Sequence, residues 1–490
     1  MRVRQFYICS VIFERNPARY TIYARSAAIR CRNTLIVLRG RFVFAISLDI
    51  SCILLHNIKN CSFSRCPMEY RHMSPAELRS EYAKEKARYE ALCDLHLSLN
   101  LARGKPEAKQ LDLSNAMLST LADDDFLCDG MDVRNYGCLD GLPSCKRLFA
   151  SLLDVQPEEV LIGGNASLNL MYDLIAKAYT NGLLHSERPW SQEPVVKFLC
   201  PAPGYDRHFN VSLSFGTELL PVRLTENGPD MEQVEALVRD PAVKGMWCVP
   251  KYSNPDGIVY SDDVCRRIAA LSPAAPDFAL MWDNAYCIHN FDGPLAEIPD
   301  ILALCREAGR PDMVYEFAST SKVTFAGAGV SCMAASRDNL AYLLGILSFQ
   351  TIGFNKIDQL MHVRFLKDRE TTLRHMEKHA AILRPKFQAV LDALDREIAP
   401  TGTAHWTRPK GGYFISLYAM PGTAKRAHAL AKQAGLSLTG AGATFPGGND
   451  PDDSNLRIAP SYATLSEIEQ AADVLCVSLK LAALERLLGI

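Results

Sequence analysis

Between residues 160 and 334, short runs of apolar residues alternate with amphipathic stretches. Stretches with apolar residues three and four apart predict helices at 167–179, 231–238 and 261–270. Continuous apolar runs that alternate with helices are typical of a parallel sheet covered by helices on both faces. The pattern therefore predicts an α/β fold with a mostly parallel sheet, whose strands lie at 160–162, 195–200, 245–249, 278–282, 313–317 and 330–334.

The segments on either side of this repeat predict a second, smaller α+β domain. A helix is expected to begin after Ser74, because Ser74-Pro75-Ala76-Glu77 combines a capping box with proline at the first helical position. A long helical region is expected at 356–397, and strands are expected at 411–417 and 456–459. Short strands between helices would complete the smaller domain.

These elements divide the chain into four predicted parts. Residues 1–72 are a basic extension, and residues 73–125 form an N-terminal helix and arm that belong to the small domain. Residues 126–365 form the large domain, and residues 366–490 form the C-terminal small domain. Ligands of parallel sheets bind at the carboxyl ends of the strands, so functional residues are expected in the loops that follow the large-domain strands.

The composition indicates a large folded protein with an uneven distribution of charge. The 490 residues are 48% hydrophobic, which is enough to bury the core of two or more domains. The net charge of −2 gives no electrostatic reason to expect nucleic acid or an acidic membrane surface as a partner. Residues 1–67 nevertheless hold 11 Lys/Arg and two acidic residues, whereas the remainder holds 42 basic and 53 acidic residues.

The basic opening segment allows several interpretations. A membrane span is excluded because Arg39, Arg41 and Asp49 interrupt the apolar stretch, and no compact apolar region with a small-residue cleavage site indicates a secretory signal. An Arg-rich transit peptide and a DNA-binding arm stay open, although no helix-turn-helix pattern supports the arm. We expect a poorly ordered extension, or upstream translation ahead of a natural start at Met68 or Met73.

The sixteen cysteines are scattered and form neither a CxxC pair nor a Cys/His zinc pattern, so no metal site is expected. A disulfide scaffold is not expected in a chain with so large a core. We therefore expect reduced thiols and a cytoplasmic protein.

Two loops after predicted strands carry residues suited to a phosphate and a flat ring. In Gly163-Gly164-Asn165-Ala166-Ser167, small residues would let a phosphate approach the amino terminus of the next helix, although such a turn is more often only a turn. Tyr205 ends the loop Pro201-Ala202-Pro203-Gly204-Tyr205. Its ring would stack on a flat cofactor or pack against its own loop.

Two further loops would hold the polar edges of such a ring. Asn254 is fixed before Pro255 and would donate to a phenolate oxygen, although Asn-Pro-Asp-Gly is good turn chemistry on its own. Asp283 directly follows a buried run, where an unpaired acid is costly. A protonated pyridine nitrogen is one suitable partner, which would make the ring a stronger electron sink, and a structural arginine is the alternative.

Lys322 completes the set. It follows Ser319-Thr320-Ser321, whose serines could bind the phosphate, and its amine could form a Schiff base and move protons. A lone loop lysine is usually only a solvated charge, but together these clusters supply what a pyridoxal phosphate (PLP) site requires. Arg457 lies inside an apolar strand and suits bidentate capture of a carboxylate, or a buried structural ion pair.

Six motifs keep their order and spacing over nearly 350 residues: Arg134-Asn135-Tyr136-Gly137, Asn254-Pro255-Asp256-Gly257, Asp283-Asn284-Ala285-Tyr286, Ser319-Thr320-Ser321-Lys322, Lys410-Gly411-Gly412-Tyr413-Phe414 and Arg457-Ile458-Ala459. With them, the chain from about Leu111 to the C-terminus resembles the fold-type I PLP-dependent aminotransferases. Within that group it is most similar to the bacterial aspartate aminotransferase-like branch often called MocR-like.

The resemblance implies a role for each of these residues. Lys322, Asp283 and Tyr205 would be the catalytic residues: the first holds PLP as a Schiff base, the second partners the ring nitrogen and the third stacks on the ring. Arg457, with Asn254, would bind the substrate α-carboxylate. The remaining implied cofactor contacts are Asn254 and Tyr286 with the phenolic oxygen, Asn165, Ala166, Ser167, Ser319 and Ser321 with the phosphate, and Tyr136 with the phosphate of the neighbouring subunit, in a homodimer with shared active sites.

One position departs from the family pattern. The family usually has a basic residue eight positions after the lysine, where it pairs with the phosphate, and this chain has Val330 there. Backbone N–H groups of the glycine-rich run Ala326-Gly327-Ala328-Gly329 could substitute, or a basic residue from elsewhere, such as Arg364 or Lys244.

The resemblance implies a ping-pong transamination between an L-amino acid and a 2-oxo acid, with aspartate and 2-oxoglutarate as the expected pair and no nucleic acid or membrane partner. Two alternatives stay open. The same site could perform another PLP reaction, such as β-elimination or decarboxylation. The chain could also be a PLP-binding transcriptional regulator whose basic N-terminus binds DNA.

Overall fold

The computed structural model describes residues 6–8, 11–16, 19–31, 34–45, 69–121 and 125–490, in two compact units, residues 1–67 and 68–490. The first unit holds one antiparallel sheet in which β3 pairs with every other strand: β1 (Phe6–Ile8), β2 (Val11–Asn16), β3 (Arg19–Cys31) and β4 (Thr34–Ala45). The sequence predicts no regular elements here. The expectation that residues 1–72 are a poorly ordered basic extension, or not native, stays a prediction.

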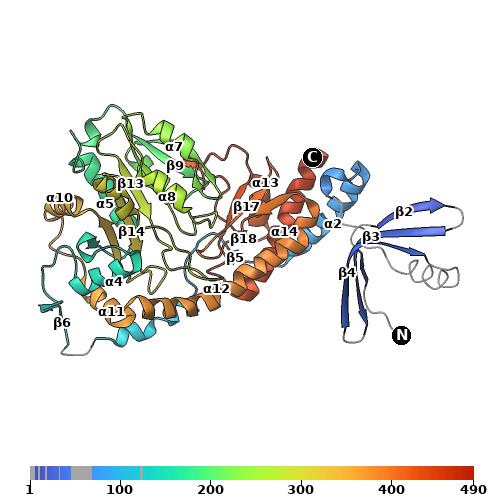
Figure 1. The fold of residues 1–490 in the computed structure, drawn as a ribbon, viewed down its shortest axis with the longest axis horizontal. Coiled ribbons are helices and arrows are strands. Elements are labelled where there is room, and N and C mark those ends of the chain that lie inside the picture. Colours follow the sequence, from blue (N-terminus) through green and yellow to red (C-terminus); the bar gives the residue numbers. More distant parts are fainter. Residues whose placement is uncertain (1–5, 9–10, 17–18, 32–33, 46–68, 122–124) are drawn as a thin grey trace. The chain divides into compact units, whose positions relative to one another are not determined.

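The second unit is built around an eight-stranded sheet with the order β11-β10-β9-β12-β13-β14-β15-β8 (Figure 1). The five strands from β10 to β14 in this order run parallel, whereas β15 is antiparallel to both of its neighbours. The strands are β8 (Val160–Ile162), β9 (Lys197–Ala202), β10 (Glu218–Thr225), β11 (Gly228–Pro229), β12 (Val243–Cys248), β13 (Ala279–Asp283), β14 (Val314–Ser319) and β15 (Ser331–Ala335).

All six strands predicted from apolar runs are present, with ends that differ by two residues or fewer. The sequence missed β10 because Pro221 lies in its middle, and a proline inside a run argues against a strand. The strand tolerates this proline because β11 pairs only with Leu224 and Thr225, which leaves most of β10 at the edge of the sheet.

Helices cover both faces of this sheet, as predicted (Figure 1). On β13, Leu280 and Trp282 belong to one buried cluster, while Ala279 and Met281 belong to the other, because successive side chains of a strand point to opposite faces. The first cluster includes residues of α4 (Pro143–Leu153), α7 (Met231–Leu237), α8 (Asp262–Ala269) and α9 (Ile301–Glu307), and the second includes residues of α5 (Ser167–Thr180), α6 (Asp206–Ser214) and α10 (Arg337–Leu347).

The predicted helical region at 356–397 consists of two helices, α11 (Lys356–Leu366) and α12 (Arg369–Glu397). The break falls at Lys367, which adopts a φ of 60°. Asp368 then caps α12, since its Oδ1 accepts a hydrogen bond from the Thr371 N–H at 2.7 Å. Neither residue is a glycine or proline, so the break has little local signal in the sequence.

A smaller α+β part combines both ends of the second unit. Leu99 near the N-terminus pairs with Leu436, and Leu78 lies in a buried cluster with Leu484. We keep the predicted limits of the large and small domains as a proposal, which these contacts support. This part begins with α2 (Pro75–Asp94), which is capped by Ser74 and Glu77 as predicted. Its other elements are β5 (Leu99–Asn100), β16 (Ala404–Trp406), β17 (Ile415–Ala419), α13 (Ala424–Gln433), β18 (Leu436–Ser437), β19 (Asn455–Ile458) and α14 (Leu465–Leu488). Three short elements follow β5 in the chain: α3 (Ala108–Asp112), β6 (Leu127–Cys128) and β7 (Met131–Asp132).

The eleven cysteines in residues 69–121 and 125–490 are all free thiols, as the sequence predicts. Within the part of the chain that the structure describes, no helix is both long and apolar enough to cross a membrane. Over the same residues, no group of three or more His, Cys, Asp or Glu side chains is arranged to hold a metal ion.

The core of the smaller α+β part leads to a prediction about the free energy of unfolding. Leu475 of α14 is 1% exposed, so Leu475→Ala should lower the free energy of unfolding by about 2–5 kcal/mol through lost burial and the cavity left behind. Urea denaturation measures this. Glu469→Ala, on the exposed side of the same helix, is the matched control and should stay within about 0.5 kcal/mol of the parent. Equal effects of the two variants would contradict this description of the core.

Candidate active site

A cavity of about 550 Å³ opens beside the carboxyl ends of β13 and β14. Most residues singled out in the sequence line it: Ala166, Ser167, Tyr205, Asn254, Asp283, Tyr286, Ser319, Ser321, Lys322 and Arg457. Two do not. Asn165 is exposed and contributes its carbonyl oxygen to a neighbouring hydrogen bond, and Tyr136 is 84% exposed. Parallel strands collect the loops at their carboxyl ends, which brings residues from distant parts of the chain into one site.

Asp283 ends β13 and is 3% exposed. Its Oδ2 lies 2.9 Å from His208 Nε2, while its Oδ1 is buried and makes no hydrogen bond. His208 is held in turn by stacking on Trp247, with ring centroids 4.3 Å apart and planes at 8°. A buried carboxylate oxygen without a donor is costly. This atom therefore suits a positively charged N–H group in the cavity.

Lys322 lies in the loop after β14, with its amine close to two aromatic rings. The Nζ is 4.9 Å from the ring centroid of Tyr286 and 5.9 Å from that of Tyr413. Desolvation of the amine lowers the pKa of Lys322, and the Asp283 carboxylate acts in the opposite direction. The amine is therefore neutral, and nucleophilic, more often than a solvated lysine.

The opposite end of the cavity carries anion-binding groups. Helix α5 begins at Ser167, and Ala166 at its N-cap supplies no side-chain cap for the N–H groups of the first turn. Ser319 Oγ donates to Ser321 Oγ at 3.1 Å, and Ser321 Oγ donates to the Asn165 carbonyl at 3.1 Å. A helix amino terminus beside hydroxyl groups is a suitable site for a phosphate.

Arg457 of β19 approaches the cavity from the small domain and is 7% exposed. Its Nη1 donates to Asp206 Oδ1 at 2.8 Å and to Asn254 Oδ1 at 3.3 Å, and its Nη2 donates to Thr439 Oγ1 at 3.1 Å. The guanidinium also lies 4.9 Å from the ring centroid of Phe414. The ion pair that the sequence left open is thus present, in a guanidinium that also lines the cavity and whose Nε makes no hydrogen bond.

Comparison with known proteins decides the family. The model of the aspartate amino-transferase family matches residues 73–490. The chain belongs to the aspartate aminotransferase family. An aspartate aminotransferase of Corynebacterium glutamicum is 47% identical over 401 residues, which cover 82% of this chain and 93% of the relative. The crystal structure of an aspartate transaminase from C. glutamicum matches with a TM-score of 0.84 and 45% identity, covering 86% of this chain and 99% of that one.

The aminotransferase fold extends to more distant structures. LysN, the α-aminoadipate aminotransferase of Thermus thermophilus, complexed with N-(5'-phosphopyridoxyl)-L-leucine, matches with a TM-score of 0.65 at 22% identity and covers 82% of this chain and 98% of that one. This likeness shows the fold alone. Together with the family match it confirms the predicted fold type I and the enzyme class, while the MocR-like label stays a prediction.

Aminotransferases of this fold depend on PLP, and the residues of the cavity fit that group. The unpaired Asp283 Oδ1 would accept the N–H of a pyridinium, and the first turn of α5 would receive the phosphate. Tyr205 and Tyr286 line the same cavity.

Val330 occupies the position at which the family usually has a basic residue, and in this aminotransferase it is part of the buried core. Its side chain is 2% exposed and belongs to the core cluster, and its backbone exchanges two hydrogen bonds with Thr320, of 2.8 and 2.9 Å. The two substitutes considered from the sequence are bound elsewhere: Arg364 donates to the Thr120 carbonyl, and Lys244 donates to Asp277 at 2.8 Å. Neither lines the cavity.

Sequence reasoning missed four residues of the site. His208 lies three positions after Tyr205 in the amphipathic helix α6, and this helical spacing could have identified it. Phe414 was noticed only as part of a matching motif. Arg103 and Arg207 line the cavity and form no ion pair among the described residues. Their loops carry no signal in the sequence, because an exposed arginine is common on any surface.

Proposed function

We propose that this aminotransferase binds PLP in the Lys322 cavity and transfers the amino group of L-aspartate to 2-oxoglutarate by a ping-pong mechanism. One observation carries the proposal: the unpaired Oδ1 of Asp283, the desolvated amine of Lys322 and the guanidinium of Arg457 all line one cavity. A PLP-dependent reaction on an amino acid needs an acid for the ring nitrogen, an amine for the cofactor and a cation for the α-carboxylate.

When bound, PLP supplies the electron sink for charge that develops on the substrate α-carbon. Lys322 holds the cofactor, and its free amine takes the proton from that carbon and returns it elsewhere. Asp283, oriented by His208, would keep the ring nitrogen protonated, and Tyr205 would stack on the ring. Asn254 and Tyr286 contact the phenolic oxygen.

The phosphate would be held by the first turn of α5 and by the hydroxyl groups of Ser319 and Ser321. Asn165 supports this arrangement by accepting the Ser321 hydrogen bond, and Ala166 and Ser167 let the phosphate approach the backbone. Tyr136 is exposed and does not line the cavity of its own chain, and it would complete the phosphate site of the neighbouring subunit in a homodimer.

The charge of the cavity supports a dicarboxylic substrate. Besides Lys322, four basic side chains line it, Arg103, Lys105, Arg207 and Arg457, against the two carboxylates of Asp206 and Asp283. Arg103 and Arg207 each directly follow a residue that is linked to Arg457 by hydrogen bonds. Arg103 follows Ala102, whose carbonyl accepts from Thr439, and Arg207 follows Asp206, the ion-pair partner of Arg457. Once Arg457 binds the α-carboxylate, these arginines are available for a second carboxylate on the side chain.

Removing either arginine should weaken binding of aspartate selectively. Arg103→Gln and Arg207→Gln should each raise the KM for aspartate about tenfold or more, because each removes a charge-assisted hydrogen bond to the side-chain carboxylate. The KM for alanine, which lacks that carboxylate, should change less than threefold. Steady-state kinetics with both donors measures this, with Arg239→Gln as a control at an exposed position just after α7. Equal changes for aspartate and alanine would exclude a role in specificity.

A donor panel tests the proposed reaction itself. Purified protein loaded with PLP is mixed with each L-amino acid in turn, and loss of the absorbance band of the lysine-bound cofactor is followed in a single half-reaction. Aspartate and glutamate should react fastest. If no amino acid yields the pyridoxamine form, transamination is rejected in favour of another PLP reaction. Salt-dependent DNA binding that disappears on deletion of residues 1–67 would instead favour the regulator.

A further inference from the structure

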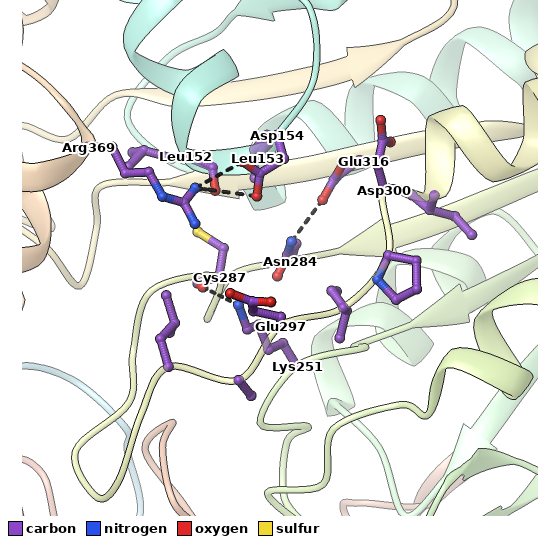
Figure 2. A pocket seen from close by; sticks show the side chains of 15 residues that line it. Leu152, Leu153, Asp154, Lys251, Asn284, Cys287, Glu297, Asp300, Glu316 and Arg369 are labelled. Carbon is purple, nitrogen blue, oxygen red and sulfur yellow. Dashed lines mark hydrogen bonds and ion pairs between the residues drawn. The ribbon is translucent and has the colours of Figure 1, made fainter.

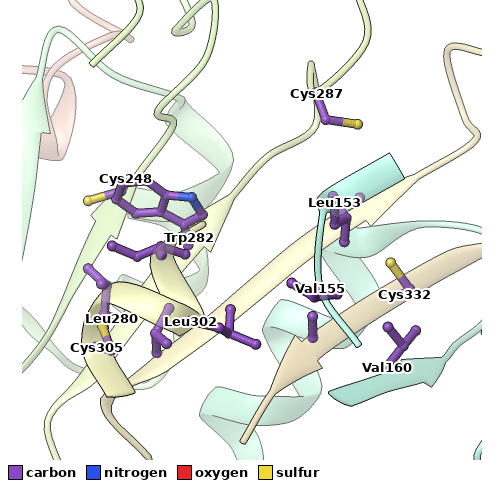
Figure 3. Packing of buried hydrophobic residues seen from close by; sticks show 14 of the residues in the cluster. Leu153, Val155, Val160, Cys248, Leu280, Trp282, Cys287, Leu302, Cys305 and Cys332 are labelled. Carbon is purple, nitrogen blue, oxygen red and sulfur yellow. The ribbon is translucent and has the colours of Figure 1, made fainter. Parts of the chain in front are cut away.

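A second cavity, of about 300 Å³, lies beside β13 and β14, the strands that precede Asn284 and Lys322 (Figure 2). The residues that line it all differ from those around Lys322. They come from the end of α4, the start of α12, the segment 295–301 and the middle of β14, together with Lys251 after β12 and Asn284 and Cys287 after β13. Leu153 and Cys287, in its wall, also belong to the buried core cluster with Val155 and Cys332 (Figure 3).

The floor of this cavity is a buried amide and carboxyl pair. Asn284 is 5% exposed and donates through Nδ2 to Glu316 Oε1 at 2.8 Å. Its Oδ1 is buried, makes no hydrogen bond and points into the cavity (Figure 2). A buried amide oxygen without a donor costs free energy. The floor therefore requires an N–H or O–H group from an occupant.

Two cations lie beside this floor with unused donors. Lys251 is 6% exposed and donates one hydrogen bond, to the Cys287 carbonyl at 2.6 Å, which leaves two N–H groups free. Arg369 donates only through Nη1, to the Ser151 and Leu152 carbonyls and to Asp154. Desolvation lowers the pKa of Lys251, and the nearby charge of Arg369 lowers it further. An anion between the two would relieve both effects.

The carboxyl group of Glu316 does not supply that anion. Burial raises the pKa of Glu316 to about 8, so the group is mostly uncharged at neutral pH. Asp154 is already paired with Arg369, and Asp300 Oδ1 caps α9 by accepting from the Ala303 N–H at 3.1 Å. Glu297 also lines the cavity. The cavity thus combines two cations that have unused donors with one buried acceptor that makes no hydrogen bond, which suits an occupant that carries both an acceptor and a donor.

We propose that this cavity is a binding site for a free α-amino acid, separate from the catalytic site. The carboxylate of the ligand would bind between Lys251 and Arg369, and its ammonium would donate to Asn284 Oδ1. The volume lies at the lower end of the range for small-molecule sites, which suits a single amino acid. The ligand would contact Asn284, the residue directly after Asp283, without entering the Lys322 cavity.

Binding stoichiometry of the holoenzyme tests this proposal. Each proteinogenic L-amino acid is first screened for its effect on the melting temperature, and those that raise it are measured by equilibrium dialysis with radiolabelled ligand. Cofactor absorbance, recorded in parallel, reports occupation of the Lys322 cavity alone. At least one amino acid should bind with two molecules per subunit, of which only one changes the absorbance.

Two variants identify the second site. Lys251→Met and Arg369→Gln should each weaken the absorbance-silent binding about tenfold or more and leave the absorbance response unchanged. Arg369 is partly exposed, so its variant tests the site independently of any effect of Lys251→Met on folding. Arg374→Gln, on the next turn of α12 and paired with Glu370, is the matched control and should bind like the parent.

One molecule per subunit in the parent, accounted for entirely by the absorbance change, would overturn the proposal and leave the cavity to water. Unchanged absorbance-silent binding in both variants would also overturn it, because the second molecule would then lie elsewhere. Neither outcome bears on the proposed transamination, which the donor panel tests.

Discussion

Replacing Lys322 with alanine is expected to lower kcat for transamination about 10⁴-fold or more. The substitution removes both the covalent attachment of the cofactor and the amine that moves the proton of the α-carbon, and a positioned proton-transfer group alone contributes about 10²–10⁴-fold. The desolvated amine lies close to the rings of Tyr286 and Tyr413, whereas Lys105, the other lysine that lines the cavity, is exposed. Steady-state kinetics measures the loss.

Borohydride reduction of the PLP-loaded protein supplies a second readout for this variant. The parent should retain the cofactor covalently after reduction, and mass spectrometry should locate it on the peptide that contains Lys322. Lys322→Ala should retain none. Lys109→Ala, which changes an exposed lysine of α3, is the control and should behave like the parent. A reducible imine at the active site of Lys322→Ala would show that another residue holds PLP.

The Asp283→Asn variant is expected to lower kcat about 10²–10³-fold, the loss typical of removing one preorganised electrostatic group from an active site. The amide keeps the size of the carboxylate but not its charge, so it can no longer keep a pyridine nitrogen protonated. The oxygen concerned is the Oδ1 that makes no hydrogen bond in the protein. The hydrogen bond with His208 through the other oxygen would survive in part, which limits the effect on folding.

Asp206→Asn is the matched comparison for this variant, because it neutralises the other carboxylate that lines the cavity. Asp206 pairs with Arg457 and not with the cofactor site, so its loss should change the KM for amino acids more than kcat. The pH dependence of cofactor absorbance separates the two as well, since only Asp283→Asn should alter it strongly. A kcat for Asp283→Asn within threefold of the parent would exclude the proposed role.

The sequence predicted the sheet well because its strands are buried on both faces. Runs such as that of β13 are continuously apolar, and two helical layers must cover them. β10 was missed for the opposite reason, since an edge strand tolerates Pro221 and polar residues that a central strand would not. The break at Lys367 was missed because a left-handed backbone at a lysine is set by packing around it and has no local signal.

The residues of the candidate site also fall into two groups: those that the sequence indicates and those that only the folded chain brings together. Lys322, Asp283 and Arg457 were identified because a charged residue next to or inside an apolar strand is unusual. The partners that tune them were not identified. Contacts such as His208 with Asp283 and Arg457 with Asp206 join residues 75 and 251 positions apart, and only the folded chain brings them together. Arg103 and Arg207 were missed because their proposed role depends on the other charged residues of the cavity, which come from distant parts of the chain.

The way the small domain is assembled affects how the protein can fold during its synthesis. Helix α2 packs with α14 through Leu78 and Leu484, and β5 pairs with β18, so segments from opposite ends of the second unit meet (Figure 1). On the ribosome, α2 leaves the exit tunnel tens of seconds before α14 has been translated, at about 5–20 residues per second. The large domain can fold in that interval, while the apolar side of α2 has no partner. Nascent chains that end before α14 should therefore depend on chaperones, because α2 can bury its apolar side only after α14 has been made.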